Sequence, residues 1–486
     1  MQPVSRRTAL LLGGLGLAGM AAGGTGLFLT LTSRPTLAVG DELTQPSILQ
    51  SSDGRLEVRL EAGPGRVKLA GQPASALAYN GEIPGPTLRV RPGDVLKVSL
   101  VNNLGGPTNL HMHGLHVSPQ GNGDNVFVRV GPGSTFDYEY RLPADHPPGV
   151  YWYHPHRHGL VADQIFAGLF GAIIVEDPAA IEVSRERVLV VSDTTLDALG
   201  DIQPTSGMDR MAGRQGQLLL VNGQLNPRLE ARPGERERWR IINACVTRYL
   251  RLGLDGQHLE LLGMDSGRLR QRLEVKELLL TPGNRADLLV NTATGDSVLR
   301  TTYYDRGAMP GMMGRGGAGA VRTEDRNGAP LVTLRVVGDS GRPLPSLAAG
   351  AAPVDLRSSA VAARRQLTLG IGTGMAMGMM GFTIDGRQFN DARTDTIVAA
   401  GSVEEWTLVN TSPMDHPFHL HVWPMQIIEE NGQAVDSVRR QDVVNLPANG
   451  RVKVRVAFDD FTGRSVYHCH ILDHEDLGMM GVIEVR

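Results

Sequence analysis

The stretch YNGEIPGPTLRVRPGDVLKVSLVNN occupies residues 79–103 and sets a pattern that the chain repeats twice more. The second copy is VNGQLNPRLEARPGERERWRIINA at 221–244, and the third is IDGRQFNDARTDTIVAAGSVEEWTLVNT at 384–411. Each copy holds a glycine turn, a strand, a second turn, a strand of alternating apolar and polar residues, and a closing asparagine. A unit that recurs at a spacing of about 150 residues predicts three similar β domains. Short strands joined by such turns favour Greek-key sandwiches or barrels, so the predicted fold class is all-β.

The chain has 486 residues, which is too long for one ordinary domain. The segment 338–365 is rich in Pro, Ala and Gly, a composition typical of linkers. We therefore predict a targeting segment at 1–40, domain one at 45–178, domain two at 179–340, a linker at 341–365 and domain three at 366–486. The 48 basic side chains balance the 51 acidic ones, and no basic block occurs, so the sequence gives no support for a nucleic-acid partner.

The N-terminus predicts export. Arg6 and Arg7 precede an uncharged run from Thr8 to Ser33 that is rich in Gly and Ala, a pattern typical of a bacterial twin-arginine signal. The predicted location is therefore periplasmic or otherwise extracytoplasmic, and we expect a monomer. The alternative is a membrane-spanning helix, since the run is long enough to cross a bilayer. No clean cleavage site follows, so an uncleaved membrane anchor stays open.

Histidines cluster at the two ends of the chain. Eight of the fourteen form four His–x–His pairs, two in domain one and two in domain three: 111/113, 154/156, 419/421 and 468/470. Residues i and i+2 of a strand point to the same face, so each pair can offer two imidazoles to one metal site. The middle domain has a single histidine, His258, and we expect it to be a spacer or a wall on the substrate side.

The last pair encloses a cysteine. The stretch VYHCHILDHEDLGMMGVIEV at 466–485 combines Cys469, His474 and Met479, and His416 supplies a further imidazole from outside it. Two histidines, one cysteine and a weak axial methionine are the ligands of a blue-copper site. Because alternate residues of a strand face opposite ways, the Cys469 sulfur can bind one copper while its two neighbouring rings bind metals on the other side. The remaining imidazoles predict a multinuclear site between domains one and three.

Together, HMHG at 111–114, HPHRHG at 154–159, HPFHLH at 416–421 and HCHILDHEDLGMM at 468–480 resemble the four copper motifs of the multicopper oxidases. The likeness is greatest to the three-domain bacterial laccases and cuprous oxidases. It implies three cupredoxin-like Greek-key β-barrel domains, four copper ions and dioxygen as the electron acceptor. By matching positions, the type 1 copper would be held by His416, Cys469, His474 and Met479, the type 2 copper by His111 and His419, and the type 3 pair by His113, His154, His156, His421, His468 and His470.

The resemblance also implies acids that deliver protons for the reduction of dioxygen to water. Glu475 matches one such position, and Asp124 is similar to the second. The alternative for Asp124 is a turn residue that caps its own backbone. His158 is interpreted as a residue that supports a ligand, while His116, His146 and His258 are interpreted as ordinary surface or core positions.

Two glycine-rich stretches carry many methionines: GAMPGMMGRGG from Gly307 and GMAMGMMG from Gly374. Thioethers favour Cu(I), and cuprous oxidases place similar segments over the type 1 site, so the expected reductants are Cu(I) and, less selectively, phenols and aromatic amines, with a role in copper tolerance. Flexible apolar loops without a metal role are the alternative. Three other functions stay open: a phenol-oxidising laccase without a role in copper homeostasis, a copper-free scaffold of the same fold, and a copper-storage protein.

Overall fold

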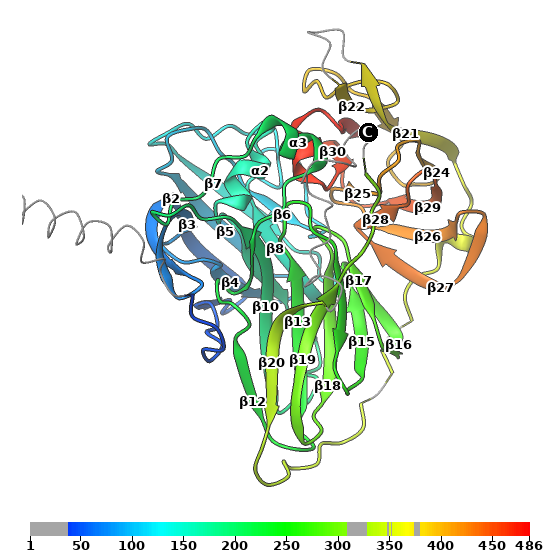
Figure 1. Cartoon of the computed structure of the whole chain (residues 1–486). Helices are drawn as coiled ribbons and strands as arrows, with labels where there is room; N and C mark the ends of the chain where they lie inside the picture. Colours follow the sequence, from blue (N-terminus) through cyan, green and yellow to red (C-terminus); the bar gives the residue numbers. More distant parts are fainter. Residues whose placement is uncertain (1–36, 309–327, 348, 351, 374–379) are drawn as a thin grey trace, which may run out of the picture.

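The computed structural model describes residues 37–308, 328–347, 349–350, 352–373 and 380–486. In this part of the chain the strands form six sheets, which fall into three pairs along the sequence (Figure 1). We call the pairs the first unit (48–175), the second unit (185–336) and the third unit (363–485). The all-β prediction is confirmed. The twin arginines and all but the last methionine of the two glycine-rich stretches lie outside the described residues.

The first unit has a five-stranded sheet, β1-β4-β9-β8-β6, and a four-stranded sheet, β3-β2-β5-β7. Its strands are β1 (Ile48–Gln50), β2 (Arg55–Leu69), β3 (Gln72–Tyr79), β4 (Gly85–Val90), β5 (Val95–Asn102), β6 (His111–His113), β7 (Thr135–Arg141), β8 (Gly149–His154) and β9 (Gly171–Val175). A short helix, α2 (Val161–Phe166), follows the second histidine pair.

The second unit has a six-stranded sheet, β11-β10-β13-β18-β15-β16, and a five-stranded sheet, β12-β20-β19-β14-β17. Its strands are β10 (Arg185–Thr194), β11 (Leu218–Val221), β12 (Arg228–Ala231), β13 (Arg236–Asn243), β14 (Leu250–Leu254), β15 (Leu259–Met264), β16 (Gly267–Val275), β17 (Leu278–Leu280), β18 (Arg285–Asn291), β19 (Gly295–Thr302) and β20 (Ala329–Val336). Helix α3 (Gly207–Ala212) begins after Ser206, whose side chain accepts the Asp209 N–H as an N-cap does.

The third unit has a six-stranded sheet, β22-β21-β24-β29-β26-β27, and a five-stranded sheet, β23-β31-β30-β25-β28. Its strands are β21 (Ala363–Thr373), β22 (Met380–Ile384), β23 (Thr396–Val398), β24 (Ser402–Asn410), β25 (His416–Leu420), β26 (Met425–Glu430), β27 (Gln433–Gln441), β28 (Val443–Leu446), β29 (Arg451–Phe458), β30 (Gly463–Cys469) and β31 (Met480–Val485). A 3-10 turn, η1 (Leu356–Ser358), precedes it, and helix α5 (Leu472–Asp476) lies between β30 and β31.

The threefold repeat has the same structural basis in each unit. The alternating strand of each copy is β5, β13 or β24, and it pairs in parallel with β2, β10 or β21. The closing asparagine then turns the chain, because its side-chain oxygen accepts the backbone N–H two residues further on. These three bonds run from Leu104 to Asn102, from Cys245 to Asn243 and from Ser412 to Asn410, at 2.9, 3.1 and 2.9 Å.

Each unit has its own apolar core, and a further cluster joins the units. This cluster combines Val150 and Trp152 of β8 with Val188 of β10, Ile242 of β13 and Leu472 of α5. Figure 1 shows the consequence: β6 and β8 of the first unit, and β25, β28 and β30 of the third, lie around the upper end of the second unit. The histidine-bearing strands therefore meet where all three units come together. Among the described residues, no helix is long and apolar enough to cross a membrane.

Candidate metal centres

The first histidine of each pair lies on a strand, and the second lies on the same strand or just past its end. Strand β6 pairs with β8, which sets His111 opposite His154, and β25 pairs with β30, which sets His419 opposite His468. The structure thus brings together all eight paired histidines, although the first and the last of them, His111 and His470, are 359 positions apart in sequence. All eight are buried, with at most 2% of each residue exposed: His111, His113, His154, His156, His419, His421, His468 and His470.

Three of these rings converge on one point. His468 Nε2 lies 3.1 Å from His156 Nε2 and 3.1 Å from His421 Nε2. Nitrogens that each bind a metal at about 2 Å are separated by about this distance. The three nitrogens are therefore placed as the ligands of a single ion, and they form one of the candidate metal-binding groups.

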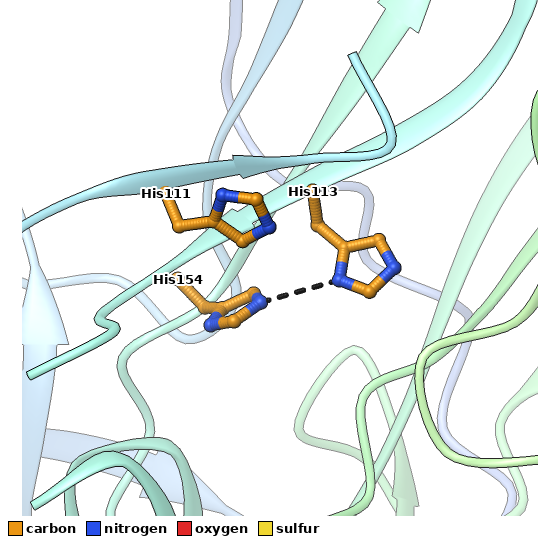
Figure 2. Close-up of side chains that lie close together, drawn as sticks. All are labelled: His111, His113 and His154. Carbon is orange, nitrogen blue, oxygen red and sulfur yellow. Dashed lines mark hydrogen bonds between the residues drawn. The ribbon is translucent and has the colours of Figure 1, made fainter. Parts of the chain in front are cut away.

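A second set of three rings lies beside the first. His154 Nε2 is 3.4 Å from His113 Nδ1 (Figure 2), and the His470 ring lies with its centroid 4.9 Å from that of His113 and 6.0 Å from that of His154. Figure 2 also shows that His111 and His113 descend from the same strand toward His154. His113 and His154 form a candidate metal-binding group with His111, and His470 lies beside them.

His111 and His419 form the remaining pair, with ring centroids 5.7 Å apart. In each ring Nδ1 has an oxygen partner: Asp124 Oδ2 at 2.9 Å for His111, and the Asp442 carbonyl at 2.8 Å for His419. Each Nε2 is buried without a hydrogen-bond partner. A buried nitrogen without a partner is costly, and a metal ion would satisfy both.

Electrostatics keep these rings in the form that binds metals. Burial lowers the pKa of the ring in all eight, as well as in His416 and His474, because the protonated form cannot be solvated, and neighbouring histidines add to the shift at every ring except His416 and His468. A neutral imidazole is a metal ligand and an imidazolium is not. The donor set therefore fits copper, for which imidazole is a suitable ligand.

A second candidate centre lies on the other face of β30. His416 Nδ1 is 3.3 Å from Cys469 Sγ and 3.4 Å from His474 Nδ1. His416 Nε2 lies 2.7 Å from Ser412 Oγ, which leaves Nδ1 to face the sulfur. Met479 is buried, and its carbonyl accepts the Cys469 N–H at 3.0 Å. Burial raises the pKa of the Cys469 thiol, so a metal would have to displace its proton.

The two predicted acids contact the eight-histidine cluster. Glu475 Oε2 lies 3.0 Å from His468 Nδ1, and Glu475 Oε1 lies 3.5 Å from His156 Nε2. Asp124 contacts His111 and accepts the Met112 N–H at 2.9 Å, so its carboxylate does not cap its own backbone. Burial raises the pKa of both carboxyl groups to about 7; His156 opposes the shift at Glu475, and the Met112 N–H opposes it at Asp124.

The remaining histidines lie away from these two centres. His158 packs on Phe389 and lines a cavity of about 280 Å³ that also borders His156. His146 is buried, His116 contacts Asp460, and His258 forms an exposed ion pair with Glu274.

Sequence reasoning missed Asp442, a residue that contacts the rings of both His113 and His419. Asp442, between β27 and β28, lies 3.0 Å from His113 Nε2, and its carbonyl is the partner of His419. Arg285 and Ser266 of the second unit bind its carboxylate, so that unit is more than a spacer or a substrate-side wall. Asp442 belongs to no motif, and Arg285 lies 157 positions away in sequence, so no local pattern indicates the contact.

Comparison with known proteins gives a consistent result. Three family models described as multicopper oxidase match residues 61–180, 187–311 and 361–486. A solved multicopper oxidase from Campylobacter jejuni, described as a metallo-oxidase, is 30% identical, with coverage of 92% of this chain and 96% of that chain and a TM-score of 0.80. A multicopper oxidase of Staphylococcus aureus is 26% identical over 92% of each chain, and a laccase of Bacillus subtilis is 25% identical over 85% of this chain and 90% of its own.

Proposed function

The chain belongs to the multicopper oxidase family, whose members are oxidoreductases that use dioxygen, and from this premise we propose how its two centres divide the work. His416, Cys469, His474 and Met479 would hold a type 1 copper, which would supply the one-electron oxidation of a reductant. The eight paired histidines would hold a trinuclear copper cluster, which would supply the four-electron reduction of dioxygen to water. The observation that carries the proposal is that the Cys469 sulfur lies beside His416 in one centre, while the ring of its neighbour His468 lies beside His421 in the other.

We assign the eight rings of the cluster to three ions. His156, His421 and His468 would hold one copper of the type 3 pair, and His113, His154 and His470 the other. His111 and His419 would hold the type 2 copper through their unpartnered Nε2 atoms. With the type 1 site this makes four copper ions. When bound, they supply the reversible one-electron chemistry that no side chain of the protein supplies alone.

The chain itself orients the ligands and handles protons. Strand β30 fixes the separation of the two centres, because His468 and His470 are each one peptide unit from Cys469. Glu475 is within reach of two cluster rings and can donate the protons that water formation consumes. Asp124 holds His111 in the tautomer whose Nε2 is free. The cavity beside His156 offers dioxygen a way to the cluster.

For the reductant, we propose Cu(I) first and, less selectively, phenols and aromatic amines, with a role in copper tolerance. The methionine-rich stretches and the similarity to a relative described as a metallo-oxidase support this choice. A laccase that oxidises phenols and has no role in copper homeostasis is the second candidate, and the similarity to a named laccase favours it. A copper-free scaffold would have no need for so many buried unpartnered ring nitrogens, and a storage protein would bind copper without consuming oxygen.

A comparison of substrates tests the choice. Oxygen uptake is measured with Cu(I), Fe(II), Mn(II) and a phenol, for the wild-type protein and a variant that lacks residues 308–314. A copper-homeostasis enzyme predicts a selective loss of Cu(I) oxidation in the variant while phenol oxidation is spared. Equal loss on both substrates would remove the argument for a copper-binding loop, and copper binding without any oxygen uptake would indicate storage.

We further propose that domain one spans 45–178, domain two 179–340 and domain three 366–486, joined by a linker at 341–365, and that the protein is an exported monomer. The sequence pattern at Arg6 and Arg7 supports export by the twin-arginine route to a periplasmic or other extracytoplasmic location. Lysine at both positions is expected to retain the protein in the cytoplasmic fraction. Release by alkaline carbonate would distinguish a soluble exported protein from one held by an uncleaved anchor.

A further inference from the structure

Asp442 lies where all three units meet, directly behind the proposed cluster. It separates β27 from β28 in the third unit, and only 2% of it is exposed. Its carboxylate contacts His113 of the first unit at 3.0 Å, and its backbone carbonyl contacts His419 of its own unit at 2.8 Å. A single residue thus contacts rings that we assign to two different coppers.

These contacts decide which nitrogen of each ring carries a proton. The carboxylate and the carbonyl can only accept here, so His113 carries its hydrogen on Nε2 and His419 carries its hydrogen on Nδ1. The lone pairs are then on the opposite nitrogens, His113 Nδ1, which faces His154, and His419 Nε2, which is unpartnered. The two rings are also stacked, with centroids 3.9 Å apart and planes 7° from parallel. Asp442 therefore holds both in the form that a metal requires.

The second unit holds Asp442 in place. Arg285, at the start of β18, binds the carboxylate through both Nη atoms, at 2.6 and 2.7 Å. Its Nε donates to the Val150 carbonyl of β8 at 3.0 Å, so the guanidinium is oriented by the first unit as well. Ser266 Oγ donates to Asp442 Oδ2 at 2.6 Å. With the arginine, the serine and His113 as donors, the carboxylate has no free position for a cation of its own.

The backbone is shaped to admit this arginine. Gly114 directly follows His113 and has a φ of +85°, and a Cβ there would lie 2.2 Å from Arg285 Nη2. Any side chain at this position would therefore collide with the guanidinium as well as strain the backbone. The glycine that follows the first histidine pair has a physical reason to be there, which is the close approach of a residue from another unit.

From these contacts we infer that Asp442, held by Arg285 and Ser266 of the second unit, is a positioning residue that fixes the tautomers of His113 and His419 for copper binding. The inference rests on the proposed function, since it concerns the ligands of the proposed cluster. It assigns the second unit, which contributes no proposed ligand, a direct role in building the oxygen-reducing site. The four histidine motifs of this sequence, at 111–114, 154–159, 416–421 and 468–480, do not include either partner of this ion pair.

The test replaces the carboxylate with an amide. Arg285 binds both carboxylate oxygens, so in Asp442→Asn the NH₂ group must face one of its Nη atoms, and at the Oδ1 position it also faces His113 Nε2. That ring must then move its hydrogen to Nδ1, the nitrogen that should bind copper; an amide in place of a carboxylate disables histidines elsewhere in this way. Asp287→Asn is the matched control, because Asp287 lies two positions after Arg285 and forms an equally buried bidentate pair with Arg238, at 2.8 and 2.6 Å. Arg285→Lys is a milder second variant, which keeps the positive charge but loses the contact through two nitrogens.

Each copper-loaded protein is assayed for copper per chain, for blue absorption and for the type 2 signal in electron paramagnetic resonance. Asp442→Asn and Arg285→Lys are expected to keep the blue absorption and to lose type 2 and type 3 copper, with an affinity about 10- to 100-fold weaker at these sites. Asp287→Asn is expected to keep the blue absorption and also the type 2 and type 3 copper. The inference is overturned if Asp442→Asn retains the wild-type copper content and type 2 signal, or if the control loses as much copper. Absence of type 2 and type 3 copper from the wild-type protein would instead overturn the proposed function.

Discussion

Glu475 lies between two rings of the proposed cluster and is wholly buried, which makes it a candidate proton donor. Glu475→Gln keeps the size of the side chain and removes its capacity to deliver protons. We expect oxygen reduction to slow by about 10²- to 10⁴-fold, the usual contribution of a positioned acid, while oxidation of the reductant is unaffected. Stopped-flow absorbance separates the two, because anaerobic bleaching of the blue colour reports the first half-reaction and its return under oxygen reports the second.

Asp476→Asn is the control for this prediction. Asp476 is half-buried next to Glu475, and its Oδ1 accepts the Gly159 N–H at 2.6 Å while its Oδ2 accepts the Ala162 N–H at 2.9 Å, so the amide loses one backbone hydrogen bond but changes no contact with a cluster ring. Glu475 would have no specific role in oxygen reduction if Glu475→Gln slowed the bleaching and the return of the blue colour equally. The same would follow if Asp476→Asn slowed the return of the colour as much as Glu475→Gln does.

His146 gives a pH-dependent prediction away from both centres. Its Nε2 is 3.0 Å from the His116 backbone N–H and its Nδ1 is 3.0 Å from the Pro147 carbonyl, so the folded protein holds it neutral. Burial lowers its pKa from 6.5 to about 3, and therefore the unfolded state binds more protons than the folded state between these values. The stability contributed by the neutral ring is complete above pH 6.5 and is lost as the pH falls from there toward 3.

His146→Gln removes this dependence. Denaturant unfolding at several pH values should show the stability of the wild-type protein, relative to the variant, falling by at most about 1.4 kcal/mol per pH unit below pH 6.5. Parallel curves for the two proteins would show that His146 is not held neutral.

At this scale the sequence predicted the histidines that the structure brings together but not the residues that support them. Metal ligands come in short motifs because neighbouring residues of one strand share a site, and the pairs at 111/113 and 468/470 display that spacing. Asp442 and Arg285 show no spacing signal, because each faces the other across a junction between units. An isolated Asp or Arg in a strand sequence is more often a surface residue, so only the fold reveals such a pair.

At the scale of elements, the loop between β17 and β18 carries a glycine that contacts the cluster. Gly283 has a φ of +87°, and a Cβ there would lie 2.9 Å from His470 Nε2. Gly283→Ala is therefore expected to displace the His470 ring, with loss of copper as well as stability. Gly234→Ala is the control, since Gly234 has a φ of +77° with nothing within 4 Å of the added carbon, and it should cost only the strain of about 1–2 kcal/mol.

Copper per chain, measured after dialysis, distinguishes the two glycine variants. Gly234→Ala should keep the wild-type copper content despite its lower stability. A full copper content in Gly283→Ala would mean that the loop has room that the structure does not show.

The repeat was predictable at this scale, whereas the short helices were not. Alternation and turn residues mark β5, β13 and β24, and the asparagine that ends each of them works the same way in all three units. Helix α5 has five residues and α3 has six, too few for a helical period to be visible, and both are fixed by tertiary contacts. One such contact is the buried pair of Arg214, which follows α3, with Asp473 of α5, at 2.6 Å.

At the scale of the whole molecule, the proposed cluster lies between the first and third units and is closed from behind by the second. Copper that binds histidines of two units should bind the folded protein much better than the unfolded chain, and so stabilise it. Removing copper with a chelator is expected to lower the melting temperature measured by calorimetry, and re-addition to restore it. A melting temperature that does not depend on copper would contradict a cluster shared between units.

The arrangement of the units could be predicted only in part. Two histidine pairs at each end of the chain required that the first and third units meet, and this follows from chemistry alone. The position of the second unit does not follow from chemistry, because this unit carries no proposed ligand. The sequence predicts only a spacer or a wall on the substrate side. The role of the unit became visible only from the buried contacts of Arg285 and Ser266, which depend on three units packing at one point.

The central claim is that electrons collected at the Cys469 site reduce dioxygen fully to water at the histidine cluster. The most direct test is to measure, in one sample of copper-loaded protein, the reductant oxidised, the oxygen consumed and the hydrogen peroxide formed. We expect four equivalents of a one-electron reductant to be oxidised per dioxygen consumed, with no hydrogen peroxide formed. We also expect no turnover in Cys469→Ser. Two equivalents per dioxygen with peroxide released, or turnover that survives the loss of Cys469, would contradict the central claim.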